Sequence, residues 1–365
     1  MNSDKKNIYT HIIKYIGIFG SIQGVCILAG VIRNKITALM LGTMGMGLMS
    51  LLNTTVVFLS QATSMGLSYS GMREIAACKE RGDQRGVERC AAIIRAWSMV
   101  AGLTGFALCA VAYKWIDKIT FSYGDHSLHY LCLSPALVLM AISGGETAIL
   151  KGMHRLKSLA VVQMVSAVGT LVITVPLLYF FDLAAIVPII VLTALVVMLS
   201  TIFYSYATVR PRMGEWHNLR ARIKKLLVEG KPMVKLGLAF VASMAMGSAT
   251  ELIIRAYLNI NSDLDTVGLY NAGYLLAITY AGIFFSSLES DYFPRISGVS
   301  NDMTKVNEMM NNQTEISLTL ISPMMCAFIV LIPVIVPLLF SSKFNDAIPM
   351  AQATALTMMC KAACL

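Results

Sequence analysis

The chain has 365 residues, of which 56% are hydrophobic and 13% are charged. A soluble domain carries about 25% charged residues, so this chain has about half of the charge that a water-exposed surface needs. Together with a mean hydropathy of +0.69, this composition excludes a soluble globular protein. The net charge of +9 would suit nucleic-acid binding only if the basic residues lay on one face of a soluble module.

Long charge-free stretches follow one another along the chain. A helix needs about 20 apolar residues to cross a bilayer, and most of the stretches come close to that length. They lack the period-2 alternation that is typical of a membrane β-barrel. We therefore predict an all-α, polytopic integral membrane protein with about ten transmembrane helices, drawn from the stretches 15–32, 36–72, 96–113, 126–145, 158–181, 183–209, 266–288 and 316–342 and the shorter 236–250 and 347–360.

The first apolar stretch follows three lysines, as in the outline of a signal peptide. The stretch is long, however, and no small-x-small cleavage site stands out before Arg33. We interpret it as a retained first helix.

The basic residues indicate the orientation of these helices. With the N-terminus inside, 22 of the 29 Lys and Arg residues fall on the inner side and six on the outer side. Such an excess is typical of cytoplasmic segments, so we predict a cytoplasmic N-terminus. The basic residues then lie beside anionic lipid, and we expect no nucleic-acid partner.

The longest inner segment, 208–235, has the pattern of an interfacial amphipathic helix. Trp216, Leu219 and Ile223 recur at helical spacing among Arg and Lys residues, which favours a helix lying on the membrane surface. We interpret it as a linker between an N-terminal six-helix bundle, 1–207, and a C-terminal bundle of about four helices, 236–365. Residues 73–95 form a second amphipathic candidate.

An internal repeat relates the two bundles. Met46-Gly47-Leu48 recurs as Val267-Gly268-Leu269 at an offset of 221 residues, and Arg33 and Arg255 precede the two copies at similar distances. Six helices separate the copies, and an even number preserves orientation. We therefore predict parallel repeats around a central cavity, which is typical of transporters; chance similarity among apolar segments is the alternative.

Three short motifs resemble a known family. Leu41-Gly42-Thr43-Met44-Gly45-Met46-Gly47-Leu48, Gly268-Leu269-Tyr270-Asn271-Ala272 and Phe293-Pro294-Arg295-Ile296 are similar to motifs of the polysaccharide (O-antigen) flippases. These belong to the multidrug/oligosaccharidyl-lipid/polysaccharide exporter superfamily.

The resemblance implies a fold and an activity. It implies two six-helix bundles that flip an undecaprenyl-diphosphate-linked oligosaccharide across the bacterial inner membrane. The expected partners are this lipid-linked oligosaccharide, membrane lipid and other polysaccharide-assembly membrane proteins. Because the chain stops at Leu365, inside or just after the tenth stretch, we expect it to lack two helices of the pattern at its C-terminus.

Two arginines and two amides are the candidate substrate-binding residues. Arg33 and Arg255 lie near the outer ends of their helices, where their guanidinium groups would bind a diphosphate through bidentate hydrogen bonds; snorkelling to the interface is the alternative. Asn53 and Gln61 lie in an unusually polar second stretch. This polarity favours the lining of a sugar cavity, although interhelical hydrogen bonds would explain part of it.

Four acidic residues are candidates for a coupling or a structural charge. Glu251 precedes Arg255 by four residues, so an intrahelical ion pair is the simpler explanation and a protonatable coupling site the other. Glu146 falls near the cytoplasmic end of the fourth helix as an ordinary interfacial carboxylate. Glu289 and Asp291 close the eighth helix beside an arginine.

No pattern of catalytic, cofactor or metal-binding residues emerges. The eight cysteines form no CxxC pair, so a disulfide or zinc framework is not expected. His126 and His129 stand in a polar loop beside Asp125. Gly42 to Gly47 lacks the lysine of a phosphate-binding loop, so we do not expect ATP-driven transport by this chain, and we expect that the protein is not an enzyme.

Two other functions stay open at this point. A cation-coupled multidrug exporter of the same superfamily is the nearest alternative. A membrane-embedded glycan polymerase or ligase would need a sizeable outer loop that holds catalytic groups, whereas the outer segments of this chain are short.

Overall fold

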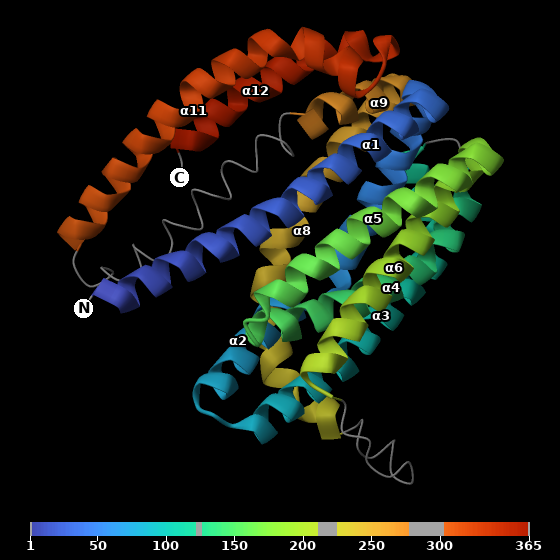
Figure 1. Cartoon of the computed structure of the whole chain (residues 1–365). Coiled ribbons are helices and arrows are strands. Elements are labelled where there is room, and N and C mark those ends of the chain that lie inside the picture. The colour runs from blue at the N-terminus through green and yellow to red at the C-terminus, as the bar shows by residue number, and fades with distance from the viewer. Residues whose placement is uncertain (1, 122–125, 211–224, 277–302, 364–365) are drawn as a thin grey trace. The chain divides into compact units, whose positions relative to one another are not determined.

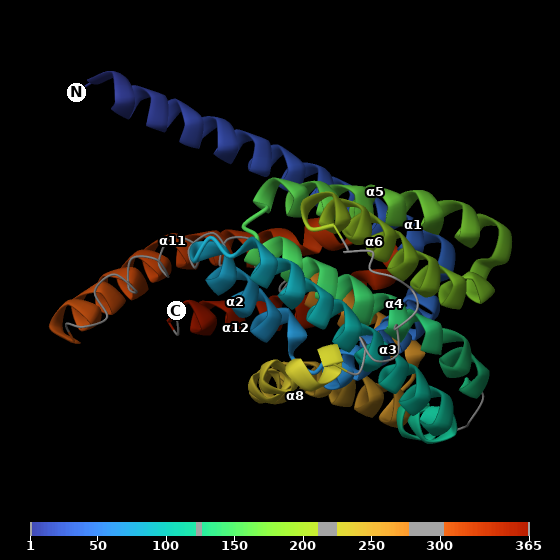
Figure 2. The same cartoon turned by 90° about the horizontal axis from the view of Figure 1, so that it is seen from below.

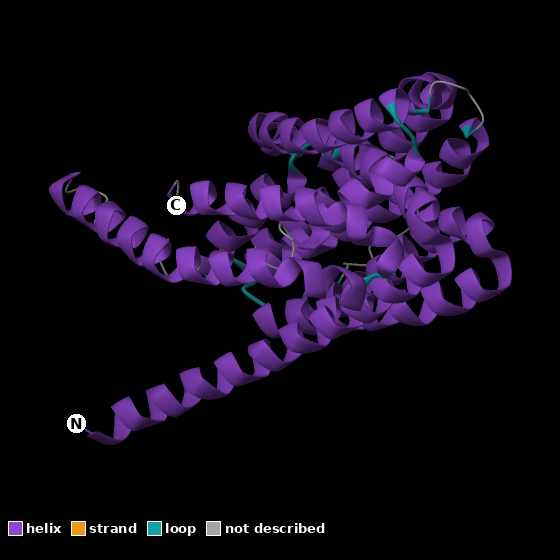
Figure 3. Cartoon of the chain, turned by 90° about the horizontal axis from the view of Figure 1, so that it is seen from above, coloured by secondary structure: helices purple, strands orange, loops and turns teal. Residues whose placement is uncertain are grey.

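The structure is a computed structural model that describes residues 2–121, 126–210, 225–276 and 303–363. Within these ranges the chain forms helices joined by short turns, and no strand occurs in them (Figure 3). The prediction of an all-α protein is confirmed.

Figure 1 shows the described helices in chain order. Their bounds are α1 (Asn2–Thr63), α2 (Leu67–Glu80), α3 (Gln84–Thr120), α4 (Ser127–Gly152), α5 (Leu156–Phe181), η1 (Asp182–Ala185), α6 (Ile186–Thr208), α8 (Lys231–Asn261), α9 (Leu264–Tyr274), α11 (Met303–Leu339), η4 (Ser342–Ala347) and α12 (Ile348–Ala363).

Six stretches of the described residues are long and apolar enough to cross a membrane. Two of them contain a break: Gly42 interrupts the helical backbone of α1 with a φ of 67°, and the 3₁₀ turn η1 separates α5 from α6. Much of the predicted stretch 266–288 lies outside the described residues. The chain is a polytopic α-helical membrane protein.

The chain folds into two compact units. Unit 1 consists of residues 1–33 and 51–261, and unit 2 consists of 34–50 and 262–365. The middle of α1 therefore belongs to a different unit from its two ends, and α8 belongs to unit 1. Residues 211–224 of the expected 208–235 linker lie outside the described residues, and the predicted domain boundaries stay a prediction.

The packing of α4 against α3 and α6 organises unit 1 (Figure 2). At Gly102 of α3, an added Cβ would lie 2.9 Å from the Cα of Val138, so the missing side chain lets α3 and α4 approach closely. At one end of these helices, apolar residues of α2, α3 and α4 form a core that includes Ile75, Ile94 and Ile149, all fully buried.

A turn divides the amphipathic helix that the sequence predicts over 73–95. Residues up to Glu80 belong to α2, and α3 begins at Gln84. Gly82 has a φ of 71°, which an L-residue rarely adopts, and the Asp83 carboxylate accepts a hydrogen bond from the Gly86 N–H at 2.9 Å as the N-cap of α3. The single helix was therefore a wrong prediction, because these two residues end one helix and start the next.

Unit 2 packs small and aromatic residues together. Its core contains Phe340, directly after α11, and Phe344 from η4. Ala351 from α12, Ala272 from α9 and Ala38 from α1 pack in the same core. Alanines at these contacts let helices approach without cavities, as is common between membrane helices.

Candidate functional site

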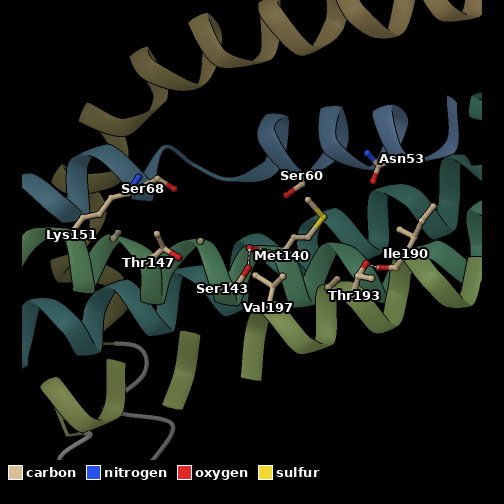
Figure 4. Close-up of a pocket in the computed structure, with 13 residues that line it drawn as sticks. Asn53, Ser60, Ser68, Met140, Ser143, Thr147, Lys151, Ile190, Thr193 and Val197 are labelled. Carbon is tan, nitrogen blue, oxygen red and sulfur yellow. Dashed lines mark hydrogen bonds between the residues drawn. The ribbon is translucent and has the colours of Figure 1, made fainter. Parts of the chain in front are cut away.

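Unit 1 contains a cavity of about 350 Å³ between α1, α2, α4 and α6, which we call the polar groove (Figure 4). Four helices contribute to its lining. The residues that line it are Asn53, Ser60, Ser68, Met140, Ser143, Gly144, Thr147, Ala148, Lys151, Ile190, Thr193, Ala194 and Val197.

A stripe of polar side chains on α4 forms one wall of the polar groove. Ser143, Thr147 and Lys151 are spaced four residues apart, so they lie on one face of the helix (Figure 4). With a rise of 1.5 Å per residue, this stripe extends over roughly 12 Å. Asn53 and Ser60, two turns apart on α1, lie across from it.

The wall formed by α6 is mostly apolar. Ile190, Ala194 and Val197 line it, and Thr193 is the polar residue among them. The Thr193 hydroxyl donates to the Ile190 carbonyl of its own helix at 3.0 Å. The polar groove therefore offers hydrogen-bonding groups from α1, α2 and α4 and an apolar surface from α6.

Several polar side chains in the groove have unused hydrogen-bonding capacity. Asn53, Ser60, Ser68 and Thr147 make no side-chain hydrogen bond with any residue that the structure describes. In contrast, Ser143 donates to the Met140 carbonyl at 2.9 Å. A hydroxylated ligand would therefore find free donors and acceptors along the groove.

Lys151 is the one charged residue among the described residues that line the groove, and the lining contains no carboxylate. Its ammonium group has no hydrogen-bond or ion-pair partner within the described part of the chain. The net charge of the lining is therefore positive, which favours a neutral or anionic ligand over a cationic one.

A buried ion pair lies behind the polar groove. Glu146 of α4 is 2% exposed, and its two carboxylate oxygens accept from Arg95 of α3, with the Nε–Oε1 distance at 2.8 Å and the Nη2–Oε2 distance at 3.2 Å. The hydroxyl of Ser205 on α6 donates to the same carboxylate at 2.5 Å. Glu146 thus links α3, α4 and α6 and is not the interfacial carboxylate that its sequence position suggested.

The same arginine also binds the end of α6. Arg95 Nη2 donates to the carbonyl of Val209 at 3.0 Å, and its guanidinium lies 4.3 Å from the ring centroid of Tyr206. Because α4 and α6 are two walls of the polar groove, these contacts fix the spacing of the walls at the end nearest Lys151.

The polar residues of the second predicted span divide between two roles. Asn53 lines the polar groove, as predicted. Gln61 is not part of the lining, and its Oε1 is buried without a hydrogen-bond partner in the described structure. Thr55 is buried, donates to the Leu51 carbonyl at 2.8 Å and lies 3.4 Å from the Tyr130 hydroxyl, which fits the alternative of hydrogen bonds within the bundle.

The two predicted arginines lie apart from the lining of the polar groove. Arg255 is 3% exposed on α8 and forms the expected intrahelical ion pair with Glu251, with an Nη1–Oε2 distance of 3.3 Å. Arg33 is half-buried on α1. Glu289 and Asp291 lie outside the described residues.

Apart from Ser60, which belongs to the polar second stretch, five polar residues of the groove were missed as site residues. Lys151 was used only for orientation, and the hydroxyl residues Ser68, Ser143, Thr147 and Thr193 were not singled out. The spacing of Ser143, Thr147 and Lys151 was a readable signal, since polar residues at i, i+4 and i+8 in an apolar helix share one face.

The fold resembles that of solved transporters. One is described as the inward-facing conformation of a multidrug resistance MATE family transporter of the MOP superfamily; the TM-score is 0.67 and the identity 14%, over 90% of this chain and 80% of that one. A crystal structure of a MATE point mutant gives 0.58 and 12%, over 93% and 79%. At these identities the likeness establishes the fold alone, so this chain is a membrane protein with the MATE fold.

The family is shown by sequence. The family model described as "Polysaccharide biosynthesis protein" matches residues 12–300, which is well over half of the chain, and the chain belongs to this family. The resemblance predicted from the glycine-rich motif at 41–48 is confirmed at this level. Among curated proteins, none matches this chain.

Proposed function

We propose that this protein flips a polyprenyl-diphosphate-linked oligosaccharide across the bacterial inner membrane. The observation that carries the proposal is the lining of the polar groove, which combines hydroxyl and amide groups with one lysine and no carboxylate. Membership of the polysaccharide biosynthesis family supports a saccharide as the cargo.

The chemistry of the polar groove suits a sugar. Sugar hydroxyls donate and accept hydrogen bonds, and burying them without partners costs free energy. Asn53, Ser60 and Thr147 have donors and acceptors to offer, whereas Ile190 and Val197 would contact the apolar faces of the rings. A lipid tail needs no such groups and would stay in the bilayer.

The proposed mechanism is alternating access, in which the N-terminal and C-terminal bundles predicted from the sequence expose the cargo first to one side of the membrane and then to the other. Arg33 and Arg255 are proposed to attract the diphosphate on the predicted outer side of the membrane. Glu251 pairs with Arg255, and as the proposed coupling site it would no longer compensate the charge of Arg255 when it takes up a proton. A cation gradient would then be the driving force of the cycle.

A cation-coupled multidrug exporter is the second candidate. The MATE fold of the chain favours it, since the first of the similar structures is described as a multidrug resistance transporter. Cationic drugs, however, bind where carboxylates compensate their charge, and the positive lining of the polar groove disfavours them. A glycan polymerase or ligase stays a third and weaker candidate.

Localisation of the cargo after gene deletion tests the proposal. If the protein is the flippase, its loss leaves the lipid-linked oligosaccharide on the cytoplasmic face, where an impermeant periplasmic glycan-labelling reagent cannot reach it. Unpolymerised cargo that is already periplasmic would instead identify the polymerase or ligase. Purified protein in vesicles that exports drugs and moves no glycolipid would overturn the flippase proposal in favour of the exporter.

A further inference from the structure

We propose that Lys151 binds the diphosphate of the cargo, so that the saccharide extends from Lys151 along the polar groove toward Asn53. This inference rests on the proposed function and adds to it the orientation of the cargo and the residue that recognises its charge. It places a first phosphate contact on α4, separate from Arg33 of α1 and Arg255 of α8.

The charge of Lys151 is uncompensated within the described residues, whereas two largely buried arginines of unit 1 are paired. Arg95 is bound to Glu146 and Arg255 to Glu251, with N–O distances of 2.8 and 3.3 Å. The Lys151 ammonium has no such partner among the described residues, and it lines a cavity without a carboxylate. An anionic ligand would supply the missing partner.

Helix capping does not account for Lys151. A basic residue in the last turn of a helix interacts favourably with the helix dipole, but Lys79 of α2 already donates to the Met153 carbonyl at this end of α4, at 2.8 Å. The Lys151 and Leu150 carbonyls accept from the backbone N–H groups of His154 and Arg155. The end of α4 is thus satisfied without the Lys151 ammonium.

The neighbours of Lys151 indicate which chemical group is attached to the phosphate of the ligand. Thr147 lies one turn along the same face of α4, and Ser68 of α2 lines the groove at the same end (Figure 4). Further along α4 and α1 come Ser143, Ser60 and Asn53. A continuous row of hydroxyl and amide groups that begins at a cation matches a sugar joined to a phosphate.

An ordinary anionic phospholipid shares the phosphate chemistry. Its headgroup would satisfy Lys151, but its acyl chains would leave the free hydrogen-bonding groups of Asn53, Ser60 and Thr147 unsatisfied. The observations therefore favour a glycosylated diphosphate over a phospholipid headgroup, and a binding experiment separates the two.

The test compares two probes on the full chain in nanodiscs of phosphatidylcholine. One probe is chitobiose joined to farnesyl through a diphosphate, and the other is chitobiose joined to farnesyl through a neutral ether. We expect the wild type to bind the diphosphate probe more tightly, by roughly tenfold or more for a charged hydrogen bond. Lys151→Gln should bring the ratio of the two Kd values close to one, and Lys151→Arg should restore most of it.

A matched control uses the equivalent place on another helix. Lys118 is exposed in the last turn of α3, as Lys151 is in the last turn of α4. Lys118→Gln removes the same charge from the same kind of helix end, and it should leave the preference for the diphosphate unchanged. An equal loss of preference in both variants would overturn the inference, as would full preference in Lys151→Gln.

Two further measurements show whether a negative result contradicts the role of Lys151 or the proposed flippase function. If vesicles of phosphatidylglycerol compete with the diphosphate probe in the wild type and not in Lys151→Gln, the occupant is a phospholipid headgroup and the inference is wrong. Movement of the diphosphate probe between leaflets is measured on the same preparations. Movement with an unchanged rate and preference in Lys151→Gln overturns only the role of Lys151, whereas a Lys151-dependent preference without any movement overturns the flippase proposal.

Discussion

The hydroxyl of Ser50 donates to Oδ1 of Asn271 at 2.9 Å, between residues that are 221 positions apart in the sequence. The same offset relates Gly47 and Gly268, the landmarks of the repeat. Their helices cross within unit 2 so closely that a Cβ on Gly47 would lie 2.0 Å from the Leu264 carbonyl oxygen. The two copies of the motif therefore contact each other at matched positions.

This crossing predicts a strong effect of one methyl group at Gly47. Gly47→Ala should lower the stability of unit 2 by about 1–3 kcal/mol, because the backbone of α9 must move to make room. Thermal unfolding in detergent measures the loss. Gly24→Ala, at a position of α1 with no atom within 4 Å of the added Cβ, should be neutral or slightly stabilising; equal melting temperatures for the two variants would contradict the prediction.

The ion pair behind the polar groove predicts a second stability effect. Glu146→Gln or Arg95→Gln should each cost about 3–5 kcal/mol, because removing one partner leaves a buried charge unpaired. The double variant Arg95→Met with Glu146→Leu should cost less than the sum of the single changes, and a double-mutant cycle of unfolding measures this coupling. Additive losses would show that the two groups do not act as a pair.

An exposed ion pair of the same unit is the matched control. Arg89 Nη2 lies 2.6 Å from Glu229 Oε1, and the arginine side chain is 62% exposed. The hydrogen bond from Arg89 lowers the pKa of Glu229 below its ordinary value. Exposed pairs contribute little to stability, so Glu229→Gln should unfold at the temperature of the wild type.

The charge of the polar groove predicts how a new carboxylate would change selectivity. Asn53→Asp should slow the movement of the diphosphate-linked cargo by at least about fivefold, because the new carboxylate would repel the diphosphate as the cargo passes along the groove. Cationic dyes should begin to bind. Asn53→Ser keeps the lining neutral at this position and should stay close to the wild type. Rapid glycolipid movement in Asn53→Asp would argue that the cargo does not pass this side chain.

The capping residue at the start of α9 predicts that the stability of the fold depends on pH. Asp263 caps this helix by accepting from the Thr266 N–H at 2.8 Å and from its hydroxyl, and these bonds lower the pKa of Asp263 below its ordinary value. The folded pKa lies below the unfolded one, so the added stability is present above the unfolded pKa and is lost as pH falls through the folded pKa.

Asp263→Asn separates the cap from its charge. The amide oxygen still accepts the hydrogen bonds, so this variant should lose the acid-dependent part of the melting curve and keep the cap. A melting temperature that falls with acid equally in the variant and the wild type would show that Asp263 is not responsible.

The membrane class and the polarity of the second span were readable from the sequence because hydropathy is a local property. The break between α2 and α3 was also encoded locally, in Gly82 and Asp83, but it was hidden by the amphipathic pattern on either side. A turn residue followed by a capping carboxylate indicates a helix boundary more strongly than a continuing amphipathic pattern indicates an unbroken helix.

The polar groove and the ion pair behind it could not be predicted from the sequence. Arg95 and Glu146 are 51 residues apart, on different helices, and their pairing depends on the rotation of each helix about its axis. Likewise, the spacing of Thr147 and Lys151 indicates a shared face of α4, but only the packing of α4 beside α1 and α6 makes that face the wall of a cavity.

The path of α1 has a consequence for dividing the protein. Residues 34–50 belong to unit 2 although they precede most of unit 1 in the sequence, so the chain passes between the units after residues 33, 50 and 261. Two fragments made by cutting within 211–224 would each be incomplete: the N-terminal fragment would carry the Gly47 segment without its partner, and the C-terminal one would carry Gly268 without its own. Co-expressed fragments should therefore recover a folded protein only by assembling with each other, and neither should be stable alone.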